Sequence, residues 1–303
     1  MSAAAGAAPT PVQVWKMAAR FPTLTAAVTP VMVGTGVAIH RDAFNLVPAL
    51  AALAGALLLQ LGANFANDAF DFKRGADTAE RLGPPRATQM GYATSRQMLA
   101  GMWFAFALAF AVGIYLVYIG GWPIVAVGVA SIAAAIIYTG GPWPIGYHAL
   151  GDLFTFVFFG LVAVAGTYYV QAGELTPLAV AAAIPAGCTV TLILVVNNLR
   201  DIPTDSKTGK TTLGVVLGDR GTRAWFVVLL AVALTVPFGL SLFSTPRWAW
   251  LASPASFPWA IGIARPITSG TAGRELNPVL RSTARYNFVL GLFLAVAIAL
   301  SPD

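Results

Sequence analysis

Two polar clusters interrupt a chain that is otherwise almost entirely apolar. The first occupies Asn64–Asp77 and the second occupies Asn197–Asp205, and together with Glu80 they hold six of the twelve acidic residues. Each cluster follows directly on a long hydrophobic segment, where a carboxylate is costly unless it has a partner or a function. Both contain the pattern Asn-x-x-x-Asp, as Asn67/Asp71 and Asn197/Asp201. Side chains of this kind indicate a site that binds a metal ion and an anion.

Helical spacing brings the polar side chains of the first cluster to one side. Residues three, four and seven positions apart share a helix face, so Asn64, Asn67 and Asp71 are expected to project together. Gly75 is expected to end this helix. The next acid, Asp77, is then left on a loop that can fold back towards the helix.

The second cluster follows the same rule. Asn197 and Asp201 are four positions apart and are expected to share a helix face. Pro203 restricts the backbone of Ile202 and is expected to end the helix, which would place Asp205 at the start of a loop.

Two such sets facing each other across a helical bundle would supply several oxygen ligands, which Mg²⁺ prefers. Around them lie cations suited to neutralising phosphate oxygens. These cations are Lys73, Arg74, Arg81, Arg86, Arg200, Lys207 and Lys210. Carboxylates and cations on one rim predict a diphosphate site that works through bridging magnesium. The alternative is that both clusters are ordinary loops whose charges stay in water and set the membrane orientation.

The composition places these clusters in a membrane protein. Of the 303 residues, 57% are hydrophobic and only 10% are charged, and the mean hydropathy is +0.74. Soluble domains carry about 25% charged residues, so the chain is expected to be an all-α, polytopic membrane protein. A scan for segments of roughly 20 apolar residues predicts nine transmembrane helices. They are Phe21–Ile39, Leu46–Phe65, Leu99–Ile119, Trp122–Thr139, Asp152–Val170, Leu178–Asn197, Arg223–Phe243, Trp248–Ala264 and Tyr286–Leu300.

The distribution of charge supports this count and indicates an orientation. With the N-terminus in the cytoplasm, nine crossings leave only Arg41 and Arg247 of the eighteen Lys and Arg residues outside, as the positive-inside rule predicts. Four spans separate the two clusters, so both are expected to face the cytoplasm. The net charge of +6 is then explained by these loops, and no nucleic-acid partner is expected. Residues 1–14 are expected to form a flexible tail and residues 15–303 a single transmembrane domain.

Several segments, the second cluster among them, resemble one family. They are Phe21–Pro30, Gly83–Gln89, Tyr138–Tyr147, Gly166–Gln171, Asn197–Asp205 and Leu276–Leu280. With clusters after the second and sixth predicted helices, the chain is similar to the UbiA superfamily of intramembrane prenyltransferases. Within it, the chain most resembles the branch that prenylates 1,4-dihydroxy-2-naphthoate in menaquinone synthesis. The resemblance covers roughly residues 15–300.

The resemblance implies a nine-helix bundle around a central cavity in the inner (plasma) membrane of a bacterium, with its active-site loops in the cytoplasm. It implies Mg²⁺-dependent transfer of a polyprenyl group from polyprenyl diphosphate to 1,4-dihydroxy-2-naphthoate, with loss of CO₂ to give demethylmenaquinone. The implied catalytic residues are Asn67, Asp71, Asn197 and Asp201. The implied metal ligands are Asn67, Asp68, Asp71, Asp77, Asp201 and Asp205. The implied diphosphate-binding residues are Lys73, Arg74, Arg86, Arg200, Lys207 and Lys210.

The acceptor is expected to bind beside residues 138–151, a loop with two tyrosines, a tryptophan and a histidine that is a candidate lid. The expected acceptor-binding residues are Arg20, Asn64, Gln89, Tyr138, Tyr147 and His148. Arg20 lies at the inner start of the first predicted helix, where it could meet the acceptor carboxylate. Snorkelling of its side chain to the interface is the alternative. For His148, a role as proton acceptor and a hydrogen-bonded surface position both fit the sequence.

Two other functions stand beside this one. A prenyltransferase of the same fold could use another acceptor, such as 4-hydroxybenzoate or homogentisate, but Gly83–Gln89 and Tyr138–Tyr147 favour the naphthoate. A secondary transporter would place its acids near the middle of the membrane, in broken helices. Here the acids lie at the ends of predicted helices, which favours the enzyme.

Overall fold

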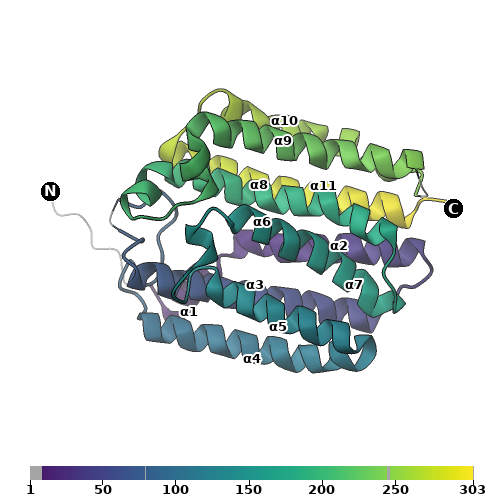
Figure 1. The fold of residues 1–303 in the computed structure, drawn as a ribbon, viewed down its shortest axis with the longest axis horizontal. Coiled ribbons are helices and arrows are strands. Elements are labelled where there is room, and N and C mark those ends of the chain that lie inside the picture. The colour runs from purple at the N-terminus through teal and green to yellow at the C-terminus, as the bar shows by residue number, and fades with distance from the viewer. Residues whose placement is uncertain (1–8, 79, 244–245, 303) are drawn as a thin grey trace.

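The structure is a computed structural model that describes residues 9–78, 80–243 and 246–302. Within these ranges the chain is almost entirely helical (Figure 1). The helices are α1 (Pro11–Ala19), α2 (Thr25–His40), α3 (Leu46–Lys73), α4 (Ser95–Gly120), α5 (Trp122–Ile137), α6 (Gly151–Thr155), α7 (Ala163–Ala172), α8 (Pro177–Lys207), α9 (Leu213–Phe243), α10 (Ala252–Thr268) and α11 (Leu276–Ala299). A π-helical stretch, Phe156–Val162, joins α6 to α7. Residues 1–8 of the expected N-terminal tail lie outside the described residues, and α1 begins at Pro11.

The structure agrees with a helical membrane protein, but the count of nine spans is not confirmed. Every predicted span overlaps one or more of these helices. Among the described residues, seven helical segments are long and apolar enough to cross a membrane. The two that fall short are α5, with 16 residues, and α10, with 17. At 1.5 Å per residue they are about 24–26 Å long, which is less than the ~30 Å of a hydrocarbon core.

The helices lie roughly side by side along one axis (Figure 1). Helices α2, α8 and α11 pack against one another in the middle, with α9 and α10 on one side and α3, α4 and α5 on the other. The segments that follow α3 and α8 both lie at the left end of the bundle in Figure 1. This arrangement brings the two polar clusters to the same end.

Glycines let the central helices approach closely. A Cβ atom added at Gly36 of α2 would lie 2.6 Å from the carbonyl oxygen of Ala295 in α11. One added at Gly160 would lie 2.7 Å from the Cα atom of Gly187 in α8. Close backbone packing of this kind stabilises helix pairs in lipid, where the hydrophobic effect gives little force between helices. These contacts hold the scaffold that carries the two clusters.

A buried amide ties the three central helices together. Asn287 of α11 accepts a hydrogen bond from Thr189 of α8 (2.8 Å). It donates to the hydroxyl of Thr29 (2.9 Å) and to the carbonyl oxygen of Thr25 (3.2 Å), both in α2. Because Asn287, Thr29 and Thr189 are fully buried, no water can replace a lost partner, and the network fixes how the three helices sit against one another.

We expect the Asn287→Ala variant to unfold at a lower temperature than the wild type, because three hydrogen bonds between helices are lost. Interhelical hydrogen bonds in membranes contribute about 0.6–1.7 kcal/mol each. Thermal denaturation of the purified protein in detergent measures the shift. Thr235→Ala is the matched control, because that exposed hydroxyl bonds only within α9. Equal shifts in the two variants would contradict an interhelical role for Asn287.

Candidate active site

The first cluster occupies the end of α3 and the loop after it. Helix α3 ends at Lys73, and the chain turns at Gly75, whose φ of 73° is a conformation that glycine adopts without strain. The backbone N–H of Ala76 donates to the carbonyl oxygen of Asp71 (3.0 Å). The predicted helix end at Gly75 is confirmed, and the chain doubles back so that Asp77 returns towards Asp71.

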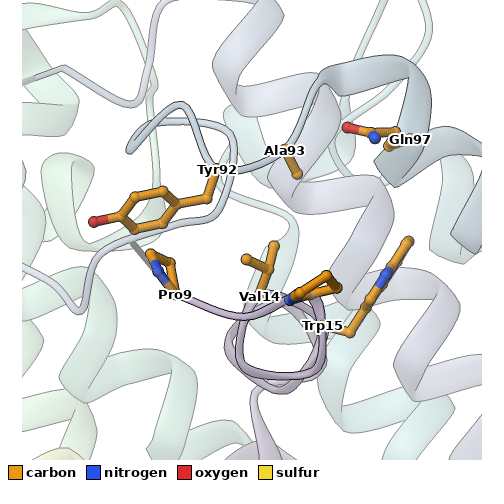
Figure 2. Close-up of a pocket in the computed structure, with 7 residues that line it drawn as sticks. Pro9, Val14, Trp15, Tyr92, Ala93 and Gln97 are labelled. Atoms are coloured by element: carbon orange, nitrogen blue, oxygen red, sulfur yellow. The ribbon is translucent and has the colours of Figure 1, made fainter. Parts of the chain in front are cut away.

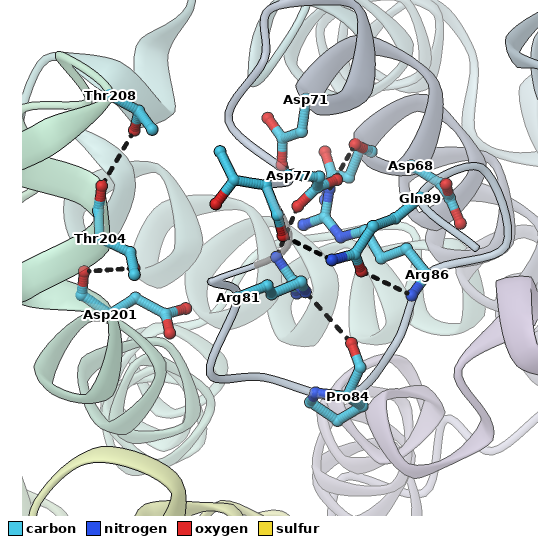
Figure 3. A network of polar contacts seen from close by, with 12 residues as sticks. Asp68, Asp71, Asp77, Arg81, Pro84, Arg86, Gln89, Asp201, Thr204 and Thr208 are labelled. Atoms are coloured by element: carbon cyan, nitrogen blue, oxygen red, sulfur yellow. Dashed lines mark hydrogen bonds and ion pairs between the residues drawn. The ribbon is translucent and has the colours of Figure 1, made fainter. Parts of the chain in front are cut away.

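One guanidinium joins the acids of the first cluster (Figure 3). The Nη1 atom of Arg86 lies 2.7 Å from Asp71 and 2.6 Å from Asp77. The same nitrogen lies 2.8 Å from the carbonyl oxygen of Asn67. Burial lowers the pKa of Arg86, but the charges of Asp71 and Asp77 outweigh burial and raise that pKa above its ordinary value. A permanent cation is therefore held where three oxygens converge.

A second arginine lies between this group and the second cluster. Arg81 pairs with Asp77 through Nη1 (2.6 Å) and donates from Nε to the carbonyl oxygen of Pro84 (3.1 Å), as Figure 3 shows. Burial, and then the charge of Arg86, lower the pKa of Arg81. The negative charges of Asp77 and Asp201 oppose this lowering. Acids from both clusters thus act on Arg81.

Two predicted site residues are engaged by the loop itself. The carboxylate of Asp68 accepts hydrogen bonds from the backbone N–H groups of Ala87 and Thr88, each at 3.2 Å, and from the hydroxyl of Thr88. Gln89 donates from Nε2 to the carbonyl oxygen of Thr78 (2.6 Å). In this structure Asp68 and Gln89 therefore order the loop after α3.

In the second cluster a buried arginine takes the central place. Arg200, which is 1% exposed, donates to both carboxylate oxygens of Asp201 (2.8 and 2.6 Å). It also donates to Asn197 (2.5 Å) and to Asn277 of α11 (2.9 Å). Asn197 and Asp201 share one helix face, as predicted from their spacing, and Arg200 ties that face to α11.

The predicted helix end at Pro203 is wrong. Helix α8 continues through Pro203 to Lys207, so Asp205 lies in the last turn of the helix, 3.9 Å from Lys210. Proline removes one helical hydrogen bond. Here α8 packs against both α9 and α11, and such tertiary contacts override a local preference of this size.

The loop after α3 carries the first cluster onto the second. Gly83 lies so close to Arg200 that a Cβ atom there would be 2.7 Å from Nη2 of the guanidinium. Lys207 pairs with Glu80, 127 positions away in the sequence, at 2.9 Å. Figure 3 shows Asp201 beside the loop that carries the arginines of the first cluster. The two clusters therefore form one polar site.

Residues 138–150 add a third wall. The hydroxyl of Tyr147 donates to Asp71 (2.8 Å). Burial, and then the charge of Asp71, raise the pKa of Tyr147, so its phenol stays protonated and remains a donor. The guanidinium of Arg74 and the ammonium of Lys210 lie 5.5 and 5.3 Å from the centre of its ring, within the range of cation–π attraction. Tyr147 thus positions two candidate phosphate-binding cations beside a candidate metal ligand.

The same loop is attached to the chain that follows α8. The backbone of residues 147–149 pairs with that of Thr211. His148 is exposed, stacks on Trp143 with ring centres 4.1 Å apart, and lies 2.8 Å through Nδ1 from the carbonyl oxygen of Pro144. This geometry favours a hydrogen-bonded surface histidine over a proton acceptor.

The remaining predicted residues occupy different places. Tyr138 is half-buried at the end of α5. Lys73 is exposed, and it forms no ion pair with the rest of the described chain. Asn64 is buried and donates to the carbonyl oxygen of Ala19 (2.9 Å), next to Arg20. Arg20 and Asn64 are therefore neighbours at the turn between α1 and α2.

Two residues of the site were not singled out from the sequence. Asn277 accepts from the buried arginine of the second cluster and donates to the carbonyl oxygen of Leu82 (3.0 Å). Thr88 binds the first cluster through its backbone and its hydroxyl. The only signal for either was its place in a segment that resembles the family, residues 276–280 and residues 83–89.

A separate hollow lies between α1 and the start of α4 (Figure 2). It is lined by Pro9, Pro11, Val14, Trp15, Tyr92, Ala93 and Gln97. It has no charged side chain, so it offers nothing to bind a diphosphate.

The oxygen atoms of the polar site fit a hard divalent cation. Carboxylate and amide oxygens from two helices point into this site. Among the described residues, however, no three Asp, Glu, His or Cys side chains lie close enough together to hold an ion by themselves. Mg²⁺ usually takes one or two carboxylates and completes its shell with water and phosphate. The arrangement therefore fits a metal that binds together with a diphosphate.

The chain is similar to known proteins over most of its length. The model of the UbiA prenyltransferase family matches residues 27–277. The 1,4-dihydroxy-2-naphthoate octaprenyltransferase of Mycobacterium tuberculosis is 44% identical over 94% of this chain and 96% of its own length. The enzyme of the same name from Escherichia coli is 36% identical over 93% of this chain and 96% of its own.

Solved structures show the same fold. A UbiA homologue from Archaeoglobus fulgidus bound to GPP and Mg²⁺ superposes with a TM-score of 0.72 at 16% identity, over 94% of this chain and 98% of that one. The apo structure of a UbiA homologue from Aeropyrum pernix K1 gives 0.70 at 17% identity, over 88% and 96%. At these identities the likeness concerns the fold alone, but the family model covers most of the chain and the curated relatives nearly all of it. The chain belongs to the UbiA prenyltransferase family.

Proposed function

We propose that the protein transfers a polyprenyl group from a polyprenyl diphosphate to 1,4-dihydroxy-2-naphthoate, with loss of CO₂ and with Mg²⁺ as cofactor, in menaquinone synthesis. Relatives named for prenyl transfer to this acceptor match nearly the whole chain. A homologue of the same fold binds GPP and Mg²⁺.

The observation that carries the proposal is the meeting of two acid clusters around buried arginines. Asp71 and Asp77 share Arg86, while Asp201 holds Arg200. Acids and permanent cations in one place can bind a metal ion and a phosphate group together. An apolar channel would not need acids paired with buried arginines. Loop charges that only set the membrane orientation would not need these pairs either.

Asp71, Asp77 and Asp201 are the carboxylates that would hold the metal, and the amide oxygens of Asn67 and Asn197 lie on the same helix faces. Bound there, Mg²⁺ would neutralise the charge that develops on the leaving diphosphate. Binding the rest of the diphosphate would be the task of this protein's own side chains.

Arg86 and Arg200, which donate hydrogen bonds to carboxylates in this structure, are also suited to donate to phosphate oxygens. The guanidinium group of Arg86 or Arg200 presents a planar fork that matches phosphate geometry. The charged groups of Arg74 and Lys210 lie against the ring of Tyr147, at the end of the bundle that holds the two clusters. Together these cations would hold the diphosphate while its bond to the prenyl group breaks.

The reaction balances without a protein base at the reacting carbon. The bond between the allylic carbon and the diphosphate oxygen breaks, and that carbon bonds to the ring carbon that bears the carboxylate. The bond to the carboxylate then breaks, CO₂ leaves, and its electron pair restores the aromatic ring. No proton has to leave the ring carbon. This agrees with the position of His148, which is exposed and stacked on Trp143.

We further propose that the two clusters face the cytoplasm, in the plasma membrane of a bacterium. With this orientation only Arg41 and Arg247 of the Lys and Arg residues would lie on the outer side, which follows the positive-inside rule.

The acceptor can be tested directly. Purified protein is incubated with a polyprenyl diphosphate, Mg²⁺ and one aromatic acid at a time. We expect a lipid-soluble product and CO₂ with 1,4-dihydroxy-2-naphthoate, and no product with 4-hydroxybenzoate or homogentisate. Mass spectrometry of the product identifies both the acceptor and the prenyl chain length. Product from another acid alone would replace the acceptor in this proposal.

Removal of the metal tests the cofactor. EDTA is expected to stop product formation, because the carboxylates cannot bind a diphosphate without a bridging cation, and added Mg²⁺ is expected to restore it. Undiminished turnover in EDTA would rule out the metal-dependent mechanism.

A further inference from the structure

Two amides of α3 cover the turn of residues 19–23, between α1 and α2. Asn64 donates from Nδ2 to the carbonyl oxygen of Ala19 (2.9 Å) and to the hydroxyl of Thr23 (3.1 Å). Gln60, one helical turn earlier, lies with Nε2 3.3 Å from Oδ1 of Asn64 and 3.4 Å from the hydroxyl of Thr23. Both amides are buried. They are polar groups that the metal and diphosphate sites do not use.

These contacts fix the orientation of both amides. A backbone carbonyl can only accept, so the atom of Asn64 that faces Ala19 must be its nitrogen. The oxygen of Asn64 then faces Gln60, which must present its own nitrogen. The Oε1 atom of Gln60 is left on the other side, buried and without a hydrogen-bond partner in the described part of the chain. Such an unpaired buried acceptor requires an explanation.

Arg20 supplies the opposite kind of unpaired group on the same turn. Its backbone has φ 50° and ψ 59°, a left-handed conformation that is unfavourable for residues other than glycine. Its Nη2 atom is buried without a hydrogen-bond partner, and no acid of the described residues pairs with it. The carbonyl oxygen of the preceding residue, Ala19, accepts from Asn64 of α3, which lies seven positions before Asp71, so the turn that carries Arg20 lies beside the helix of the first cluster. Strained backbone and an unpaired cation together indicate a binding role.

We propose that Arg20 and Gln60 together recognise the acceptor, an inference that rests on the proposed function. The guanidinium of Arg20 binds the carboxylate of an aromatic hydroxy acid, and Oε1 of Gln60 accepts a hydrogen bond from its hydroxyl. An unpaired donor and an unpaired acceptor fit a ligand that has both an anionic group and an O–H group. A fully ionised diphosphate has only acceptor oxygens, so it would leave Gln60 unpaired.

The position of Gln60 indicates which hydroxyl it binds. Gln60 stands eleven positions before Asp71 in the sequence, about 16 Å along the helix at 1.5 Å per residue. Arg20 lies nearer the acids, where the carbon that bears the carboxylate must meet the prenyl group. Gln60 therefore faces the 4-hydroxyl, the one farther from the carboxylate. A site built around a hydroxyl discriminates strongly against an analogue without it, so Gln60 determines specificity.

The first test is Gln60→Met, which keeps the size of the side chain and removes the acceptor oxygen together with the Nε2 donor to Asn64 and Thr23. We expect the KM for 1,4-dihydroxy-2-naphthoate to rise about 10-fold, as for the loss of a buried hydrogen bond. The KM for the prenyl diphosphate should stay within about twofold. The inhibition constant of 1-hydroxy-2-naphthoate, which lacks the far hydroxyl, should also be unchanged. A purely structural role would not separate these two acids.

The second test is Arg20→Gly, which removes the guanidinium and relieves the left-handed backbone. We expect the melting temperature to hold or rise, while the KM for the acceptor rises about 10- to 100-fold, the loss expected for a charge-assisted hydrogen bond. Free guanidinium at millimolar concentration should partly restore acceptor binding. The control is Asp42→Gly at the other end of α2, where φ is 54°. It relieves the same strain and should leave both KM values unchanged.

The outcomes separate the inference from the function it rests on. A rise in the KM for the prenyl diphosphate in Arg20→Gly would assign Arg20 to the diphosphate and overturn the inference. Unchanged acceptor KM in both variants would do the same while leaving the proposed function intact. A wild-type protein that prenylates none of the acids would instead overturn the proposed function.

Discussion

The Asp71→Asn and Asp201→Asn variants are expected to lose at least ~10³-fold in kcat/KM, because each removes a charge on which metal binding depends. Asparagine keeps the size of the side chain. It also keeps an oxygen that can accept from Tyr147 in the first cluster or from Arg200 in the second. The loss is therefore a loss of charge rather than of packing. The dependence of the initial rate on donor and acceptor concentration measures it, and thermal denaturation shows that the variants are folded.

Asp219→Asn is the matched control for these two variants. Asp219 pairs with Arg223 at 2.8 Å, on an exposed part of α9. Its charge is far more open to solvent than those of the clusters, and exposed pairs of this kind contribute about 0–1 kcal/mol. It should keep wild-type activity. Normal turnover in a folded Asp71→Asn or Asp201→Asn variant would rule out the metal site.

The features that could be predicted from the sequence are local ones. Helical periodicity sets which side chains share a face, so the grouping of Asn197 with Asp201 follows from spacing alone. The turn at Gly75 follows from a conformation that glycine adopts without strain. The rule that failed was also local. Pro203 does not end α8, because packing against neighbouring helices outweighs one lost hydrogen bond.

What the sequence could not provide is the path of the loop after α3. Asp68 and Asp71 look equivalent in the sequence. In the structure, however, the carboxylate of Asp68 accepts hydrogen bonds from backbone N–H groups of that loop, whereas the carboxylate of Asp71 pairs with Arg86. Only the tertiary position of the loop decides between them. Asn277 could not be predicted for the same reason. Its side chain is uncharged and lies 77 positions from Arg200 in the sequence, so the sequence does not indicate that Asn277 and Arg200 are in contact.

Helix length was a further limit. An apolar window shows that a segment avoids water, but not that its helix is long enough to cross a membrane. Helix α5 has 16 residues and α10 has 17. Both lie beside longer helices that bury part of their surface. Composition alone therefore counted nine crossings where seven helical segments of the described chain meet the requirement.

The paired arginines have a consequence for metal binding. A single nitrogen of Arg86 contacts two carboxylates and one backbone oxygen. A guanidinium in this position holds the acids together, and it would compete with a divalent cation for the same oxygens. Substrate phosphate would relieve this competition, because it would offer the arginine new acceptors.

Arg86→Gln is therefore expected to lower turnover and, at the same time, to make the stability of the protein depend on Mg²⁺. Leaving buried carboxylates without their cation costs about 3–5 kcal/mol, so in EDTA the variant should unfold at a much lower temperature than the wild type. Without any substrate, Mg²⁺ should restore much of that loss, because the vacated position now suits a cation. The wild type, which carries its own cation there, should respond far less.

Arg223→Gln is the control for this experiment, because Arg223 pairs with the exposed Asp219 and also donates to the carbonyl oxygens of Ile267 and Thr271. Its removal should lower the melting temperature equally in EDTA and in Mg²⁺. If Arg86→Gln behaved in the same way, the metal and the guanidinium could not share a position, and Asp71 would pair with Arg86 for stability alone. A selective response to Mg²⁺ would instead identify Arg86 as the residue that keeps the acids together until the metal and the diphosphate arrive.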